Sequence, residues 1–306
     1  MSVDLLSKCS PEELEVRTNF KRDYKLSCPV LDDDDIFNKS LIVGGLEEDW
    51  DEYFEMCKRY PDINEYRKKI RNSVINYISS VKEFEELKPE EYKYKFTGPR
   101  SIIGDHTEKY LGERLISVDL IKGNYQSLKS ISPKFILDTE NYEELINRFT
   151  KEKCLISSKF FRQMVFGLLK PDVQAARQKN LLGDVIERVF KEKELEIVSL
   201  SNDEVVFHIT GDDELKIIED AVSASESDCR IVPFRLERIP NGYNEPWYVK
   251  YFADSKEKRL MGIHVKYLMQ VYNFIEGCDN DVKDFWWRER GRLCTLLEPE
   301  RFGVSN

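Results

Sequence analysis

The stretch Ser199–Ile209, SLSNDEVVFHI, places two adjacent carboxylates, Asp203 and Glu204, between two short apolar runs. Apolar runs that flank an Asn-Asp pair are typical of two strands joined by a tight turn. This pattern predicts a β-hairpin and leaves two interpretations of its charges open. Either the carboxylates help to hold a metal ion, or they are ordinary turn residues that face water.

The composition is that of a globular chain with a sizeable core. Of its 306 residues, 41% are apolar and 12% are aromatic, and the net charge is −10. The charge argues against broad, nonspecific binding to nucleic acid but leaves a local basic groove open. The longest apolar runs are far shorter than the roughly 18 residues of a membrane span, so no membrane partner is expected.

The cysteine pattern bears on localisation and on metals. The seven cysteines form no C-x-x-C pair, and the chain has only three histidines. A zinc module is therefore not expected. The N-terminal residues lack the order of a signal peptide, and we predict an intracellular, reducing compartment, either cytoplasmic or nuclear.

The N-terminal third is predicted to be mainly helical. Residues 1–40 show no regular pattern beyond the acidic run Asp32–Asp35, which is interpreted as a turn or as the N-terminal cap of a helix. One helix is expected over about 46–59. A second is expected from Asp62 until Pro89 forbids its continuation. The basic segment Arg67–Arg71 is expected to lie mainly on the solvated side of that second helix.

From about residue 92 the pattern changes to short strands and helices. Strands are expected at 114–120, in the hairpin and at 231–239, 247–253 and 258–264, and helices at 140–151, 157–169, 173–193, 213–223, 265–276 and 281–297. The predicted class is α+β, with an antiparallel sheet, helices packed on one of its faces and a helical N-terminal region. The predicted divisions are 1–91, a core at 92–264 with a helical insert at about 157–193, and C-terminal helices at 265–306.

Asp119 ends the predicted strand LISVD, so its carboxylate would emerge at the end of that strand. If this strand and the hairpin are neighbours in one sheet, Asp119 and Asp203 converge. Converging carboxylates repel each other unless a cation lies between them. Mg²⁺ suits such a place because it accepts a few carboxylate oxygens and keeps other positions for water and phosphate.

Three segments, in this order, resemble the palm and fingers of family A DNA polymerases and, more distantly, of single-subunit RNA polymerases. SVDLIKGNYQSL (117–128) resembles the motif in which a metal-binding Asp ends a strand. SSKFFRQMVFGLL (157–169) has a basic residue, three further residues and Phe-Gly, as the fingers helix of the family does. SNDEVVFHI (201–209) is similar to the family's Asp-Glu hairpin. The resemblance covers about residues 115–210 and implies a palm-like sheet.

The resemblance also implies roles for the acidic residues. Asp119 and Asp203 would hold two Mg²⁺ ions, and Glu204 beside them would complete the catalytic group. In such a site the two ions stabilise the attacking and leaving oxygens of a phosphoryl transfer.

The nucleotide-binding residues are likewise implied by the resemblance. Arg162 would contact the triphosphate of the incoming nucleotide, which a fork-shaped guanidinium can bind through two hydrogen bonds. Phe166 would pack against the nucleotide sugar. Asn124 or Tyr125 would lie near the 2′ position of that sugar.

The sequence is therefore compatible with two functions. The first is a Mg²⁺-dependent, DNA polymerase-like nucleotidyltransferase that adds nucleotides to a nucleic-acid 3′ end, with a nucleoside triphosphate and nucleic acid as its partners. The alternative is a catalytically degenerate palm scaffold that binds a protein partner through its acidic surface. Departures from the family pattern favour the alternative: Asn202 replaces a histidine, Lys170-Pro171 replaces Tyr-Gly, and the segment after Gly167 is short.

Overall fold

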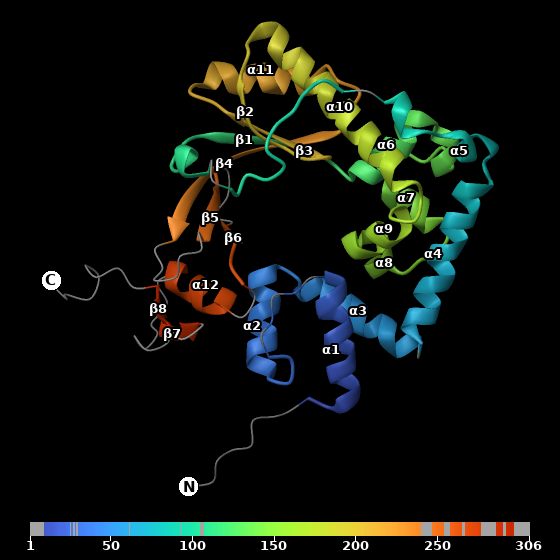
Figure 1. Ribbon diagram of the computed structural model, residues 1–306. Coiled ribbons are helices and arrows are strands. Elements are labelled where there is room, and N and C mark those ends of the chain that lie inside the picture. Colours follow the sequence, from blue (N-terminus) through green and yellow to red (C-terminus); the bar gives the residue numbers. More distant parts are fainter. Residues whose placement is uncertain are drawn as a thin grey trace, which may run out of the picture. The chain divides into compact units, whose positions relative to one another are not determined.

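The computed structural model describes residues 9–24, 26, 28, 30–60, 62–92, 94–104, 107–239, 247–253, 258–264, 267–276, 286–289 and 292–296. The chain forms two compact units (Figure 1). Unit 1 comprises Met1–Lys95 and Leu120–Leu181, and unit 2 comprises Phe96–Asp119 and Leu182–Asn306. The segment 120–181 thus groups with the N-terminal helices, whereas the predicted division had placed it with the sheet.

Unit 1 is built from helices. They are α1 (Pro11–Tyr24), α2 (Asp34–Gly44), α3 (Glu47–Arg59), α4 (Ile63–Ser80), α5 (Lys82–Glu86), η1 (Pro89–Glu91), α6 (Gly123–Ile131), η3 (Pro133–Ile136), α7 (Tyr142–Asn147), α8 (Lys153–Ser157), α9 (Lys159–Phe166) and the first half of α10 (Pro171–Glu192). The helical character of the N-terminal region is confirmed.

The expectation of an irregular segment over residues 1–40 was wrong, because α1 and α2 occupy much of it. The buried face of α1 consists of Arg17, Phe20 and Asp23, so two of its three buried side chains are charged. An apolar period is therefore hardly visible in the sequence of α1. The cap predicted within the acidic run is confirmed, because the Asp33 carboxylate accepts a hydrogen bond from the Ile36 backbone N–H at 3.0 Å.

The helix predicted to begin at Asp62 is present but is broken in two. Asp62 caps α4 by accepting a hydrogen bond from the Glu65 backbone N–H at 2.9 Å. The backbone becomes extended at Val81, and α5 begins one residue later. Arg67 departs from its predicted solvated position, since it is 5% exposed and forms a buried ion pair with Asp23.

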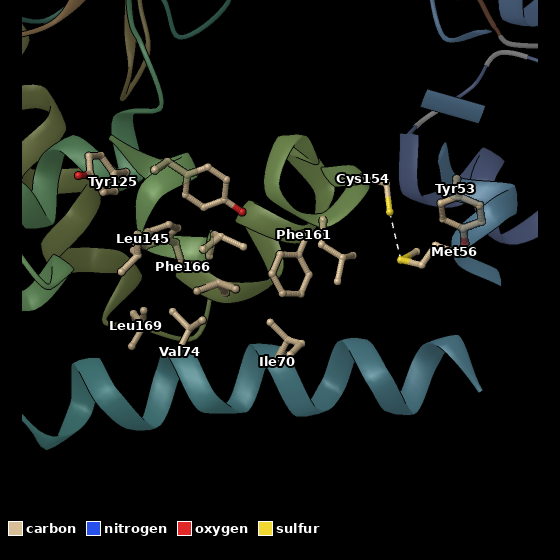
Figure 2. Close-up of a cluster of buried hydrophobic side chains, with 14 of the residues drawn as sticks. Tyr53, Met56, Ile70, Val74, Tyr125, Leu145, Cys154, Phe161, Phe166 and Leu169 are labelled. Carbon is tan, nitrogen blue, oxygen red and sulfur yellow. Dashed lines mark hydrogen bonds between the residues drawn. The ribbon is translucent and has the colours of Figure 1, made fainter. Parts of the chain in front are cut away.

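The core of unit 1 lies against the buried face of α4. Figure 2 shows Phe161, Phe166 and Leu169 directed toward Ile70 and Val74 of that helix, and all five side chains belong to one buried cluster. Burial of this apolar surface is the main source of stability for the unit.

Unit 2 contains a six-stranded sheet whose order is β2-β3-β1-β4-β5-β6. The strands are β1 (Leu115–Leu120), β2 (Glu196–Leu200), β3 (Glu204–His208), β4 (Cys229–Ile239), β5 (Trp247–Phe252) and β6 (Lys258–Met261). The β1/β3, β2/β3, β4/β5 and β5/β6 pairs are antiparallel. Figure 1 shows α11 (Asp212–Ser223) and the C-terminal half of α10 beside β1, β2 and β3. The predicted α+β class and the predicted hairpin are both confirmed.

One face of the sheet changes from apolar to charged along the strands. Its apolar part packs against Tyr110 of the short helix η2 (Thr107–Tyr110) and consists of Leu115, Val198, Val206, Phe234 and Leu236. Residues two apart share a face of a strand. Ser117 and Asp119 therefore continue the Leu115 face toward the end of β1, where Asp119 lies opposite Glu204.

The predicted helix over 281–297 was wrong. The described residues of this segment form β7 (Trp286–Glu289) and β8 (Arg292–Thr295), an antiparallel pair in which Trp287 lies opposite Cys294. Tryptophan and threonine favour strands, and here they outweigh the helix-like spacing of the aromatic residues. The preceding helix α12 (Leu268–Glu276) agrees with the prediction for 265–276. In the described part of the chain, no helix is long and apolar enough to span a membrane.

Glu214, in the first turn of α11, gives a prediction about acid stability. Burial raises the pKa of Glu214. The Lys193 ammonium at 2.6 Å and the Thr210 N–H and O–H donors have a larger, opposite effect, so the net pKa is lowered to about 2. An unfolded glutamate has a pKa of about 4.3. The stabilisation is thus complete above about pH 4.3 and is lost as the pH falls toward about 2. We expect Glu214→Gln to reduce the acid-dependent loss of stability in this window, measured by denaturant unfolding at several pH values. Parallel pH profiles of the two proteins would contradict the assignment.

Candidate functional site

The Asp119 strand and the Asp-Glu hairpin are neighbours in the sheet. In the β1/β3 register Asp119 lies directly opposite Glu204, and Ser117 lies opposite Val206. Directly opposite side chains of an antiparallel pair project from the same face, with Cβ atoms about 5 Å apart. Asp203 precedes β3 in the turn, is exposed, and accepts a hydrogen bond from Ser201 Oγ at 3.1 Å. The predicted convergence of the acidic residues required these strands to be neighbours in one sheet, and they are.

Asp119 is a partly buried carboxylate beside both like and opposite charges. Its side chain is 28% exposed, and Arg230 Nη2 of β4 lies 2.8 Å from its Oδ2 atom. Burial raises the pKa of Asp119, the Arg230 guanidinium lowers it, and the charges of Glu204 and Asp203 raise it further, so that the net shift is upward. The acidic residues thus influence one another electrostatically.

Glu204 connects the hairpin to a second cation. Its Oε1 atom accepts a hydrogen bond from Ser117 Oγ at 2.5 Å, which fixes the carboxylate over β1. The same atom lies 4.0 Å from Nζ of Lys250. This separation is longer than the roughly 2.7–2.9 Å of a charge-assisted hydrogen bond.

Lys250 is a buried lysine in β5 that sequence analysis missed. The residue is 8% exposed, and its Nζ lies 3.8 Å from the ring centroid of Phe234 and 5.3 Å from that of Phe252. Burial lowers the pKa of Lys250, and the nearby Glu204 carboxylate raises it in part. The only signal in the sequence is one lysine within the otherwise apolar and aromatic strand WYVKYF (247–252). Such a signal does not reveal what the lysine faces.

Two carboxylates suffice for a divalent-ion site only where the substrate supplies further ligands. Among the described residues, no group of three or more His, Cys, Asp or Glu side chains is arranged to hold a metal ion. Mg²⁺, however, is commonly held by one or two carboxylates together with water and substrate phosphates. Asp119 and Glu204, opposite each other and with side chains that are 28% and 37% exposed, offer such a pair of oxygen donors. Asp203 lies in the adjoining turn.

The predicted nucleotide-binding residues lie in unit 1, and two of them belong to its core. Phe166 is 0% exposed and Tyr125 is 3% exposed. The Tyr125 hydroxyl donates a hydrogen bond to the Thr139 carbonyl oxygen at 2.7 Å. Both rings pack among apolar side chains (Figure 2). In this structure a nucleotide could reach neither ring without displacing its neighbours.

Asn124 and Arg162 are also engaged within unit 1. The Asn124 side-chain oxygen accepts a hydrogen bond from Gln178 Nε2 at 2.7 Å. The Arg162 guanidinium lies over the Tyr142 ring, 5.6 Å from its centroid. The structure thus groups Asp119, Asp203 and Glu204 in unit 2, whereas the four predicted nucleotide contacts belong to unit 1.

No known protein family, no curated protein and no solved structure matches the chain.

Proposed function

We propose that the chain is a Mg²⁺-dependent nucleotidyltransferase that adds nucleotides to a nucleic-acid 3′ end. The observation that carries the proposal is the register of β1 and β3, which sets Asp119 opposite Glu204 at the end of one sheet face. The two carboxylates come from strands that are far apart in the sequence, and only the pairing of β1 with β3 brings them together. Asp203, in the turn beside it, is the third acidic member.

Each of these residues has a distinct role in the proposal. Asp119 and Asp203 provide oxygen ligands for divalent cations, and Glu204, which lies opposite Asp119 and is held by Ser117, provides a further carboxylate oxygen. When bound, the Mg²⁺ ions would neutralise the charge that develops on the phosphoryl oxygens. Arg230 balances Asp119 in the absence of substrate. Because the Arg230 side chain is 65% exposed, its ion pair with Asp119 is weak enough to exchange.

A second candidate is the catalytically degenerate scaffold that binds a protein partner. One observation favours it, namely that Phe166 and Tyr125 are core residues rather than surface contacts for a nucleotide. In this alternative, Arg230 and Lys250 are permanent counter-ions for the acidic pair. The protein would then bind neither Mg²⁺ nor a nucleoside triphosphate at this place.

The proposal is tested by incubating the full chain with a labelled nucleoside triphosphate and a primer that has a free 3′ hydroxyl. We expect extension of the primer with Mg²⁺ and none with excess EDTA, because the carboxylates alone cannot stabilise the developing charge. Primers of DNA and RNA, each with and without a template, define the substrate. Lack of Mg²⁺-dependent extension on every primer would favour the degenerate scaffold.

A further inference from the structure

The sheet face that carries Asp119 and Glu204 also carries three cations on the neighbouring strands. Arg230, Lys250 and Arg259 come from β4, β5 and β6, and Lys250 lies directly opposite Arg259 in the β5/β6 register. Both arginines are close enough to Lys250 to lower its pKa through charge repulsion. The face is thus divided into an acidic half on β1 and β3 and a basic half on β4–β6.

Lys250 is the buried member of the basic half, and its ammonium has no hydrogen-bond partner within the described part of the chain. Among the described residues, its Nζ makes no hydrogen bond, and its nearest carboxylate oxygen is that of Glu204 at 4.0 Å. Burying a charged group without hydrogen bonds is unfavourable, and lysines are rarely buried without a close partner. The Phe234 and Phe252 rings contact the cation through their π faces, so its N–H donors have no hydrogen-bond partner among the described protein groups.

A purely structural role would call for a different geometry. A structural ion pair closes to hydrogen-bonding distance, as Arg230 and Asp119 do at 2.8 Å. An apolar side chain of similar length would also fill the space between two phenylalanine rings without the cost of desolvating a charge. A charged residue is better explained at this position by a ligand that uses its donors.

On the basis of the proposed function, we propose that Lys250 is the phosphate-binding residue of the site. It binds the polyphosphate of the substrate only when the polyphosphate is in complex with a divalent cation. The cation occupies the acidic half and the phosphate oxygens reach the basic half. The two halves balance each other in the free protein, so an anion alone would meet the Glu204 and Asp119 carboxylates as well as the cations. A divalent ion removes this repulsion and makes the two binding events cooperative.

The test uses inorganic triphosphate, which has no base or sugar and so probes the phosphate subsite alone. Its binding to the full chain is measured by calorimetry with and without Mg²⁺, for the wild type, Lys250→Met, Lys250→Arg and the control Lys216→Met. Lys216 lies on α11, is exposed, and pairs with Asp220. Thermal unfolding of each protein is followed in parallel.

We expect the wild type to bind triphosphate far more tightly with Mg²⁺ than without it. Lys250→Met should weaken this binding by about ten- to a hundredfold, the effect of losing hydrogen bonds from a charged donor, while its unfolding temperature stays the same or rises. Lys250→Arg should retain most of the affinity, and Lys216→Met all of it. Unchanged binding in Lys250→Met, or equal binding without Mg²⁺, would overturn the inference.

These outcomes are distinguishable from failure of the proposed function. Binding that depends on Mg²⁺ and on Lys250, without any primer extension, would support the phosphate subsite and refute the transferase. Primer extension together with full triphosphate binding by Lys250→Met would refute the role of Lys250 and leave the transferase in place.

Discussion

Asp119→Asn is expected to lower the rate of primer extension by about a thousandfold or more. The amide keeps the size of the side chain but removes the negative charge that would hold a divalent ion opposite Glu204. Charge stabilisation by a bound metal is worth several kcal/mol in a phosphoryl transfer, and each ~1.4 kcal/mol corresponds to a factor of ten in rate. The measurement is single-turnover extension of a labelled primer at saturating Mg²⁺.

The control for Asp119→Asn is Asp220→Asn, which removes an exposed carboxylate of α11 that pairs with Lys216. This control should extend primers at the wild-type rate. Asp119→Asn should also remain folded, because the ion pair that it loses involves an arginine that is 65% exposed, and such pairs contribute at most about 1 kcal/mol. A wild-type extension rate in folded Asp119→Asn would show that the activity comes from another site or from a contaminating enzyme.

The hairpin and the strand that ends in Asp119 were predictable because local patterns determine them. Alternating and continuous apolar runs mark β1, β2 and β3, and Asn202-Asp203 marks the turn. Their pairing could only be stated as a condition, since nothing local to β1 specifies β3 as its neighbour across 83 intervening residues, 121–203. The pairing places Asp119 opposite Glu204 rather than Asp203.

The basic half of the face could not be predicted for a related reason. Arg230, Lys250 and Arg259 are separated in sequence and meet the acidic residues only through the order of strands β1, β4, β5 and β6. Lys250 in particular lies among aromatic residues, and such a context predicts a buried strand without indicating a charged group on its inner face. A lysine within such a strand is the one local signal that could have drawn attention to this position.

Motif spacing was a weaker guide for the helical segments. Arg162 and Phe166 stand four residues apart on α9, which places both on one side of the helix. The same spacing is produced by core packing, and here Phe166 is buried among the residues of unit 1. The other two errors have opposite causes. Charged residues on the buried face of α1 interrupt the apolar period from which helices are predicted, whereas the aromatic residues around β7 imitate such a period in a segment that forms a strand.

Phe166→Ala is expected to destabilise unit 1 by about 3–5 kcal/mol, the usual cost of removing a fully buried phenylalanine side chain. Phe166 is 0% exposed, and its ring centroid lies 6.1 Å from that of Tyr142. The cavity left by alanine would border the buried face of α4, which cannot collapse onto it without moving a whole helix (Figure 2). Denaturant unfolding monitored by circular dichroism measures the loss.

The matched control for Phe166→Ala is Leu168→Ala, two residues along the chain and 62% exposed. A truncation on the surface should change the free energy of unfolding by no more than about 0.5 kcal/mol. If Phe166 instead contacts a nucleotide, as the polymerase-like spacing implied, the result reverses: Phe166→Ala would keep its stability and lose affinity for the nucleoside triphosphate. Measuring both quantities on both variants therefore decides whether this phenylalanine belongs to the core or to a ligand site, because packing and binding predict opposite combinations of stability and affinity.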